Sequence, residues 1–226
     1  MATILIATRN AHKVQEIRAI LGGQFHFLTL NDFPGAPKVI ENADTFTGNA
    51  TKKAVELARW LEARDEQRMP DYVLADDSGL EVDALNGAPG VRSARFAATD
   101  ANENSSDADN NTKLLGLLKD VSLEKRSARF RCVIALTPVF SRKVESASPV
   151  CYADESELQT QVCDGACEGR IIFELRGKNG FGYDPLFVPV GFDQTYAELG
   201  DDVKNTLSHR AKALEKLRAF FMSKSN

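Results

Sequence analysis

The sequence lacks the features that mark membrane, exported and nucleic-acid-binding proteins. No apolar run approaches the roughly 20 residues that a membrane-spanning helix needs, and the first residues lack the basic region and apolar core of a signal peptide. The basic excess typical of nucleic-acid binders is absent too, because the formal net charge is -4. We therefore expect a cytoplasmic protein that binds neither membranes nor nucleic acid, in which any phosphate site is local.

Motifs that mark common cofactor sites are also missing. The four cysteines lie in a chain without an export signal, so reduced thiols are expected; they are Cys132, Cys151, Cys163 and Cys167. No histidine or second cysteine pair has the spacing that would make a zinc site with Cys163 and Cys167. The glycines follow neither the phosphate-binding Walker pattern nor the G-x-G-x-x-G order of dinucleotide-binding folds.

The order of the predicted elements favours an α/β fold. At 226 residues the chain fits one domain, or one domain of two lobes. Helices and strands intermix from end to end, which predicts a single sheet with helices around it. Strand patterns occur at 3–8, 72–75, 80–84, 129–136, 169–176 and 186–189, and helical patterns occur after residue 8, at 45–64, around 114–118, after 195 and at the C-terminal end.

Two segments carry little pattern. Residues 100–112 are polar and rich in Asn and Asp. Residues 141–164 predict a surface hairpin or insertion, placed near 144–167, within a single domain over 1–226.

Two adjacent carboxylates, Asp76 and Asp77, follow the apolar run 72–75 and precede Ser78 and a glycine. Ligand-binding residues of α/β proteins lie just past the carboxyl ends of strands, so this position suits a metal ion. Side chains alternate along a strand, so only one of the two acids is expected to be a direct ligand or base. The same composition is common in ordinary polar turns, and the residues alone leave both interpretations open.

A second polar cluster joins the first predicted strand to the first helix. Its members are Thr8, Arg9, Asn10, Ala11, His12 and Lys13. Free backbone N–H groups at a helix start, with the positive end of the helix dipole, suit such a turn for phosphate. A capped helix with solvated basic residues is the alternative.

A third group lies towards the C-terminal end. Glycines flank Phe181 and Tyr183, which would let a flat ligand lie against a ring while Asp184 accepts a hydrogen bond from it. The alternative is a glycine loop with two aromatic residues anchored in the core. Further on, His209 and Arg210 form a donor pair for phosphate or for a carbonyl group.

Together these clusters resemble the inosine triphosphate pyrophosphatase family, the XTP/dITP diphosphatases that remove non-canonical purine nucleotides. The likeness runs in order along nearly the whole chain. Its residues are Ala7 to Asn10 with Lys13; Glu41 to Phe46, Asn49, Ala50, Lys53 and Ala54; Ala75 to Leu80, Gly87 to Val91 and Ser93 to Arg95; and Gly180 to Pro185, Ala197 to Leu199, Lys204 and Ser208 to Arg210.

The resemblance implies a fold and a set of site residues. The fold would be an elongated mixed β-sheet flanked by helices, in two lobes with the nucleotide in the cleft between them, usually as a homodimer. Asp77 would be the catalytic carboxylate, and Glu41 with Asp77 would bind Mg²⁺. The substrate would be held by Thr8, Arg9, Asn10, Ala11, His12, Lys13, Lys53, Ser78, Phe181, Gly182, Tyr183, Asp184, Lys204, His209 and Arg210.

The implied activity is Mg²⁺-dependent hydrolysis of ITP, dITP and XTP to the monophosphate and pyrophosphate, which cleanses the nucleotide pool. Asp77, or less readily Asp76, would accept the proton of the attacking water. A pyrophosphatase for other nucleotides, a nucleotide sensor without catalysis and, more remotely, a nucleic-acid-binding module are the alternatives. One departure concerns Gly48, where the family often has a glutamate. No role follows from the sequence for residues 144–167.

Overall fold

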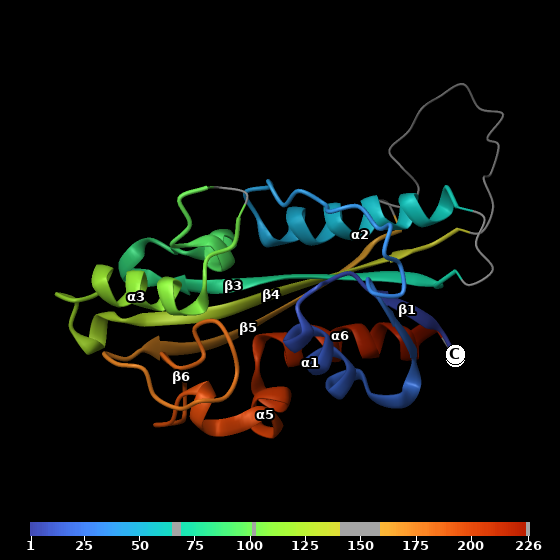
Figure 1. The fold of residues 1–226 in the computed structure, drawn as a ribbon. Coiled ribbons are helices and arrows are strands. Elements are labelled where there is room, and N and C mark those ends of the chain that lie inside the picture. Colours follow the sequence, from blue (N-terminus) through green and yellow to red (C-terminus); the bar gives the residue numbers. More distant parts are fainter. Residues whose placement is uncertain (65–68, 101–102, 141–158, 225–226) are drawn as a thin grey trace. The chain divides into compact units, whose positions relative to one another are not determined.

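The computed structural model describes residues 1–64, 69–100, 103–140 and 159–224. In this part of the chain six strands form one mixed sheet, in the order β2-β1-β3-β4-β5-β6 (Figure 1). The strands are β1 (Thr3–Ile6), β2 (His26–Thr29), β3 (Tyr72–Val82), β4 (Ser127–Pro138), β5 (Gln161–Ile171) and β6 (Phe187–Pro189). The helices are α1 (Ala11–Leu21), α2 (Phe46–Glu62), α3 (Asp107–Leu117), α5 (Tyr196–Leu207) and α6 (His209–Lys224). The expected α/β class with a mixed sheet is confirmed.

The chain divides into two compact units. Unit 1 comprises Met1–Asp77 and Val133–Cys163, and unit 2 comprises Ser78–Cys132 and Asp164–Asn226. The divisions fall inside β3, β4 and β5, so each of these strands contributes residues to both units.

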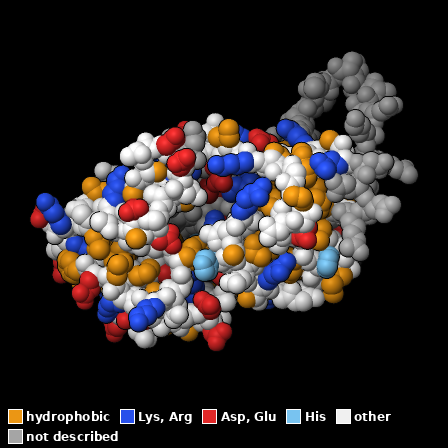
Figure 2. Space-filling view, viewed as in Figure 1, with side chains coloured by type: hydrophobic (Ala, Val, Ile, Leu, Met, Phe, Trp, Pro, Cys, Tyr) orange, Lys and Arg blue, Asp and Glu red, His pale blue; other side chains and the backbone are white. Residues whose placement is uncertain are grey.

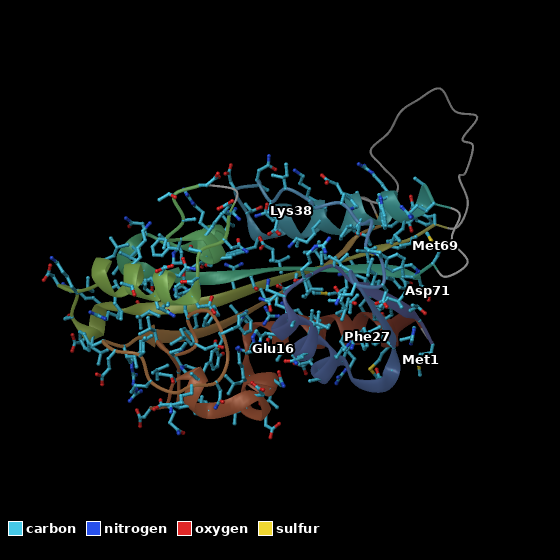
Figure 3. The ribbon with its side chains drawn as sticks, viewed as in Figure 1. Met1, Glu16, Phe27, Lys38, Met69 and Asp71 are labelled. Carbon is cyan, nitrogen blue, oxygen red and sulfur yellow. The ribbon has the colours of Figure 1, made fainter. Side chains whose placement is uncertain are left out.

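Unit 1 is built around β1, which pairs in parallel with β2 and with β3. The start of this pairing is fixed by Asp71, whose carboxylate accepts a hydrogen bond from Thr3 N at 2.7 Å, near Met1 (Figure 3). The chain steps from β1 to β2 in one direction and back past β1 to β3 in the other. Because parallel crossovers are right-handed, α1 and α2 then cover opposite faces of the sheet, as Figure 1 shows.

Both crossover helices begin at a residue whose side chain caps the helix. The Asn10 side chain accepts a hydrogen bond from Lys13 N at the start of α1, and Thr45 does the same for Gly48 N at the start of α2. The expected apolar stripe of α2 is buried, with Leu57 and Leu61 at most 1% exposed. The helices predicted after residue 8 and over 45–64 are confirmed.

Strand β3 differs from the prediction, because it is one strand of 11 residues. The sequence indicated a strand end at Asp76 and Asp77, a turn at Ser78, and a second strand from residue 80. The extended strand instead continues through these polar residues. The turn composition is overridden because the ammonium groups of Lys13 and Lys53, on other elements, lie near the two buried acids, as described below.

Unit 2 has its own apolar core, which includes Leu80, Leu114, Phe130, Phe187 and Tyr196. Its helix α5 begins after residue 195, as the helical pattern predicted, and a capping box forms there, since Glu198 accepts a hydrogen bond from Thr195 N at 2.7 Å. The strand at 129–136 and the C-terminal helix also occur where their periodicity predicted them.

A buried arginine binds the backbone of residues that belong to this core or pack against it. Arg126 is 1% exposed, and its guanidinium donates to the carbonyl oxygens of Val121 at 2.9 Å, Ile172 at 3.1 Å and Leu118 at 2.5 Å. Burial lowers the pKa of Arg126. One planar group thus binds the turn 118–121 and Ile172 together.

The predicted boundaries of β5 were wrong at both ends. The strand begins at Gln161, so residues 161–167 do not belong to a surface insertion, and Cys163 and Cys167 are buried in it. It ends at Ile171, whereas the prediction extended to 176. The rest of the expected insertion, up to residue 158, lies outside the described residues. The described cysteines, Cys132, Cys163 and Cys167, are free thiols, as expected.

The visible face of the molecule carries acidic and basic side chains interspersed with apolar ones (Figure 2). Among the described helices, none combines the length and the hydropathy needed to cross a bilayer.

Candidate active site

Asp76 and Asp77 occupy neighbouring positions of β3 in unit 1, and both are buried, with exposures of 1% and 6%. Because the strand does not turn here, the two side chains leave it in opposite directions. Asp76 accepts a hydrogen bond from the ammonium group of Lys13, in the first turn of α1. The sequence left open which of the two acids is the ligand or base. The structure separates them onto opposite faces of β3.

Asp77 lies in a mixed electrostatic environment. Its pKa is raised from the ordinary 3.8 to about 6, and burial is the main cause; the Lys13 and Lys53 ammonium groups lower it, the Glu41 carboxylate raises it, and a hydrogen bond with the Asn49 side chain lowers it. Its Oδ2 atom is buried and has no hydrogen-bond partner among the described residues. A buried carboxylate oxygen without a donor is costly, so its retention here points to a ligand or a reacting group.

Lys53 connects the other acid of this cluster to β3. Its Nζ lies 2.9 Å from Glu41 Oε1 and donates to the Asp76 carbonyl oxygen at 3.1 Å. Lys53 lies on the buried side of α2 and its side chain is 11% exposed, so it is not the solvated charge that its residue type would suggest. The two segments that the sequence singled out, around Glu41 and around Asp77, are thus brought together.

The segment that follows Glu41 is fixed by a residue that sequence reasoning did not select as a site residue. Asn49 is 0% exposed, and its Oδ1 accepts a hydrogen bond from Ala43 N at 2.9 Å. Gly48 packs against the same segment, because a Cβ atom there would lie 2.8 Å from the Cβ of Ala43. A glutamate at this position would require Ala43 to move, so the departure at Gly48 agrees with the local packing.

The acids present suit a hard divalent cation. Glu41 and Asp77 offer carboxylate oxygens, which Mg²⁺ prefers, and the unpartnered Oδ2 of Asp77 is available for it. In the described ranges no group of three or more His, Cys, Asp or Glu is arranged to hold a metal ion. This donor set fits a Mg²⁺ ion that takes one or two protein carboxylates and completes its shell with substrate oxygens and water.

The predicted phosphate turn of unit 1 opens towards solvent. Asn10 N donates to Thr8 Oγ1 at 3.1 Å, and Asn10 Oδ1 accepts from Lys13 N at 3.2 Å, which fixes the start of α1. Arg9 is exposed and donates to the Ala36 carbonyl oxygen at 3.4 Å. Asn10, Ala11 and His12 are also exposed, so the amino end of the helix is accessible to an anion.

In unit 2, the glycine loop 180–185 is held by α5. Lys204 Nζ lies 2.6 Å from Asp184 Oδ2, and the same oxygen accepts from Phe181 N at 2.9 Å. Lys204 also lies 4.5 Å from the centre of the Phe181 ring, which is partly exposed. A Cβ atom at Gly180 would come within 2.2 Å of the Asp184 carboxylate, so only glycine fits there.

Tyr183 does not offer the stacking face that the sequence suggested. It is 3% exposed, belongs to the core of unit 2, and donates from its hydroxyl to the Ser93 carbonyl oxygen at 2.9 Å. Burial raises the pKa of this phenol. Of the two rings in the loop, Phe181 is the one with a partly exposed face.

Gly182, between these aromatic residues, contacts a helix that the sequence did not link to the site. Gly182 N donates to Asp107 Oδ2 at 2.7 Å, and Asn111 Nδ2 donates to Gly182 O at 2.9 Å. Both side chains belong to α3. The sequence held one signal for this contact, namely that Asp107 and Asn111 are four residues apart and so share a helix face. We interpreted the segment 100–112 only as polar.

His209 and Arg210 are buried at the start of α6, with exposures of 4% and 1%. The His209 imidazole stacks on Phe130, with 4.8 Å between ring centres. Arg210 Nη2 donates to Ser78 Oγ at 2.9 Å. Ser78 and Arg210 both belong to unit 2, so this hydrogen bond joins α6 to the part of β3 in the same unit.

Comparison with known proteins places the chain in a family. The model of the Ham1 family matches residues 4–220. The dITP/XTP pyrophosphatase of Desulforamulus reducens is 43% identical over 214 residues, which is 94% of this chain and 92% of the relative. The dITP/XTP pyrophosphatase of Exiguobacterium sibiricum is 44% identical over 217 residues, which is 96% of this chain and 95% of the relative.

Solved structures agree with the sequence relatives. The HAM1 protein from Coxiella burnetii is 36% identical, with a TM-score of 0.75 over 99% of this chain and 100% of that one. The Ham1 protein of Staphylococcus aureus is 35% identical, with a TM-score of 0.75 over 98% of this chain and 99% of that one. The resemblance inferred from separate motifs is confirmed over nearly the full length, and the chain belongs to the Ham1 family.

Proposed function

We propose that this chain hydrolyses the non-canonical purine nucleoside triphosphates ITP, dITP and XTP to the monophosphate and pyrophosphate. Relatives at 40% identity or more that carry the name dITP/XTP pyrophosphatase support this substrate class. The observation that carries the chemistry is the Asp77 carboxylate, buried beside two lysines and a second acid, with one oxygen unpartnered among the described residues.

Asp77 accepts the proton of the water that attacks the α-phosphorus. Its pKa, raised by burial to about 6, leaves it mostly ionised at neutral pH while making it a better base than an ordinary aspartate. Asp76 has a different role: its carboxylate is engaged by Lys13 and holds that ammonium group in place.

The basic residues of unit 1 bind the triphosphate. Lys13, Lys53 and the amino end of α1, with Arg9, supply positive charge and N–H donors where negative charge develops on the leaving pyrophosphate. Mg²⁺ held by Glu41 and Asp77 would add positive charge against the phosphate oxygens. Lys53 keeps Glu41 close to β3 through its ion pair.

Residues of unit 2 bind the base and ribose. Phe181 offers a ring for stacking, and stacking alone does not discriminate between bases. Selectivity for a 6-oxo purine then requires donors, which we assign to Arg210, Lys204 and His209. Arg210 contacts Ser78, and Lys204 contacts Asp184. A site built around a hydrogen bond to that oxygen would leave its donors unpaired against adenine, and such mismatches can cost 10⁴–10⁵ in discrimination.

Product analysis tests the proposed function. ITP, dITP, XTP, GTP and ATP are incubated with the purified chain, with and without Mg²⁺, and pyrophosphate and orthophosphate are measured. We expect pyrophosphate from ITP, dITP and XTP only when Mg²⁺ is present. Release of orthophosphate, or equal use of ATP, would contradict the proposal. Binding of ITP without any turnover would favour a nucleotide sensor.

The Asp77→Asn variant tests the proposed base. Because a general base contributes about 10²–10⁴-fold, turnover of dITP should fall by at least about 100-fold while the variant still binds the nucleotide. A variant that keeps more than about a tenth of wild-type turnover would remove Asp77 from this role.

We also propose a cytoplasmic homodimer that acts on free nucleotides and binds neither nucleic acid nor membranes. Family membership supports the cytoplasmic homodimer that acts on free nucleotides. The net charge of -4 supports the absence of nucleic-acid and membrane binding. Light scattering on the purified chain measures the oligomeric state, and a monomer at micromolar concentration would contradict the dimer.

A further inference from the structure

Helix α3 holds the glycine loop of unit 2 at Gly182. Asp107 Oδ2 accepts from Gly182 N at 2.7 Å, and Asn111 Nδ2 donates to Gly182 O at 2.9 Å. Asp107 and Asn111 are four residues apart, so they lie on the same face of the helix. Both polar backbone groups of Gly182 are therefore engaged by one helix.

The backbone conformation of Gly182 depends on these two hydrogen bonds. Its φ of 62° lies in the left-handed region, and among the described residues other than its two chain neighbours no atom comes within 4 Å of the position that a Cβ would occupy. Packing around the residue therefore does little to fix it, and glycine loses more conformational freedom than any other residue when it is ordered. The hydrogen bond to the Asp107 carboxylate is charge-assisted and of the stronger kind.

The two neighbours of this glycine are themselves constrained. Phe181 donates from its N–H to Asp184 Oδ2, which also binds Lys204, and Tyr183 is anchored through Ser93. A rotation at Gly182 would change the direction of the Phe181 ring relative to Asp184 and Lys204. The conformation of Gly182 thus determines the position of the Phe181 ring relative to the buried ion pair of Lys204 and Asp184.

We propose that Asp107 and Asn111 are positioning residues that determine base selectivity, because they hold loop 180–185 in the conformation that receives the purine. The inference rests on the proposed function and assigns to it a helix with no other role there. A preformed loop does not lose conformational entropy when the base binds, so it binds more tightly than a loose one. A loose loop would also adapt to the wrong base.

The experiment compares Asp107→Ala and Asn111→Ala with Asp109→Ala. Asp109 is a matched control, because it is an acid in the same first turn of α3, is exposed, and contacts Ser106 instead of Gly182. For dITP we expect KM to rise about tenfold in the two test variants, with kcat within about twofold of wild type. The preference for dITP over dATP, as a ratio of kcat/KM values, should fall by a similar factor. The control should match wild type.

Two measurements separate a positioning role from general damage. Inhibition by inorganic pyrophosphate, which has no base, should be unchanged in the test variants. Amide hydrogen exchange at Gly182 should accelerate in them and not in Asp109→Ala. Asn111→Asp keeps the size of the side chain and replaces the donor with an acceptor, so it provides the same test if the alanine variants do not fold.

The outcomes are distinct. A wild-type chain that releases no pyrophosphate from any nucleotide overturns the proposed function and this inference with it. An active wild type whose test variants keep KM and base preference, despite faster exchange at Gly182, overturns the inference alone. A tenfold weaker inhibition by pyrophosphate in the test variants would also contradict it, because the effect would then extend beyond the base.

Discussion

Lys204 and Asp184 form a buried ion pair, with 2.6 Å between Nζ and Oδ2 and both side chains 3% exposed. Lys216 and Asp164 form a pair of nearly the same length, 2.7 Å, with side chains 56% and 59% exposed. The two pairs differ in their surroundings more than in their geometry. Removal of one partner leaves an isolated charge in the core in the first case and a hydrated one in the second.

This contrast predicts a large difference in stability between two equivalent substitutions. Asp184→Ala should lower the free energy of unfolding by about 3–5 kcal/mol, because the Lys204 ammonium stays buried without its carboxylate. Asp164→Ala should lower it by less than about 1 kcal/mol. Urea denaturation of the two variants measures both values. Similar losses would contradict the assignment of a desolvated pair.

The pKa of Asp77 predicts a pH-dependent stability. The folded-state pKa of about 6 exceeds the ordinary 3.8, so the folded chain binds this proton more tightly than the unfolded chain. Stability from this group is therefore present below pH 4 and is lost as the pH rises to 6. At pH 7.5 without metal, Asp77→Asn should be more stable than wild type, by up to a few kcal/mol.

Thermal unfolding in EDTA across this pH range measures the effect of Asp77→Asn. The gain should shrink towards zero near pH 4, where the wild-type carboxyl is protonated in the folded chain. A variant that is less stable than wild type at pH 7.5, or a gain that does not change with pH, would show that burial does not dominate the environment of Asp77.

Lys13 is predicted to serve two purposes that a double variant separates. Lys13→Met should raise KM for dITP and also lower stability, because the buried Asp76 carboxylate loses its ammonium partner. Adding Asp76→Asn removes the buried charge, so the double variant should regain most of the stability. Its KM should stay about tenfold or more above wild type, since the phosphate contact is still missing.

Steady-state kinetics and urea denaturation on the same preparations test this expectation for Lys13. If the double variant recovered both stability and KM, the lysine would act only as the structural partner of Asp76. If KM did not change in either variant, Lys13 would not contact the triphosphate.

Arg126 is predicted to resist even a conservative replacement. Arg126→Lys should lower the free energy of unfolding by more than about 2 kcal/mol, because one ammonium group cannot reach three carbonyl oxygens that a planar guanidinium reaches together. Arg129→Lys is the matched control on β4, with a side chain 30% exposed in a surface ion-pair network, and should lose less than about 1 kcal/mol. Equal losses in urea denaturation would contradict the role of Arg126.

Local signals in the sequence predicted much of the fold. The helical patterns after residue 8 and at 45–64 mark α1 and α2 correctly, because a helix start and a buried face depend on residues a few positions apart. The break predicted at Asp77 was wrong for the opposite reason. Two acids and a glycine favour a turn locally, whereas the distant Lys13 and Lys53 help to make a continuous strand acceptable there.

The contacts of the candidate site were harder to predict than its residues. Motifs brought Glu41, Lys53 and Asp77 to attention, and the structure places these three together. Whether Tyr183 stacks on a ligand or packs in the core depends on Ser93, 90 residues away, and no local pattern reports this. The hydrogen bond from Asn111 to Gly182 spans 71 residues, and no local pattern reports it either.

The division of units inside β3, β4 and β5 has a consequence for synthesis on the ribosome. Unit 1 needs Val133–Cys163 before its set of strands is complete, and unit 2 needs Asp164–Asn226. Residues 78–132 are therefore synthesised before the C-terminal helices that complete their unit, and part of their apolar surface stays uncovered until then. A chain that ends at Cys163 would contain every residue of unit 1 but lack Asp164–Asn226 of unit 2, and the uncovered apolar surface of residues 78–132 would then favour aggregation.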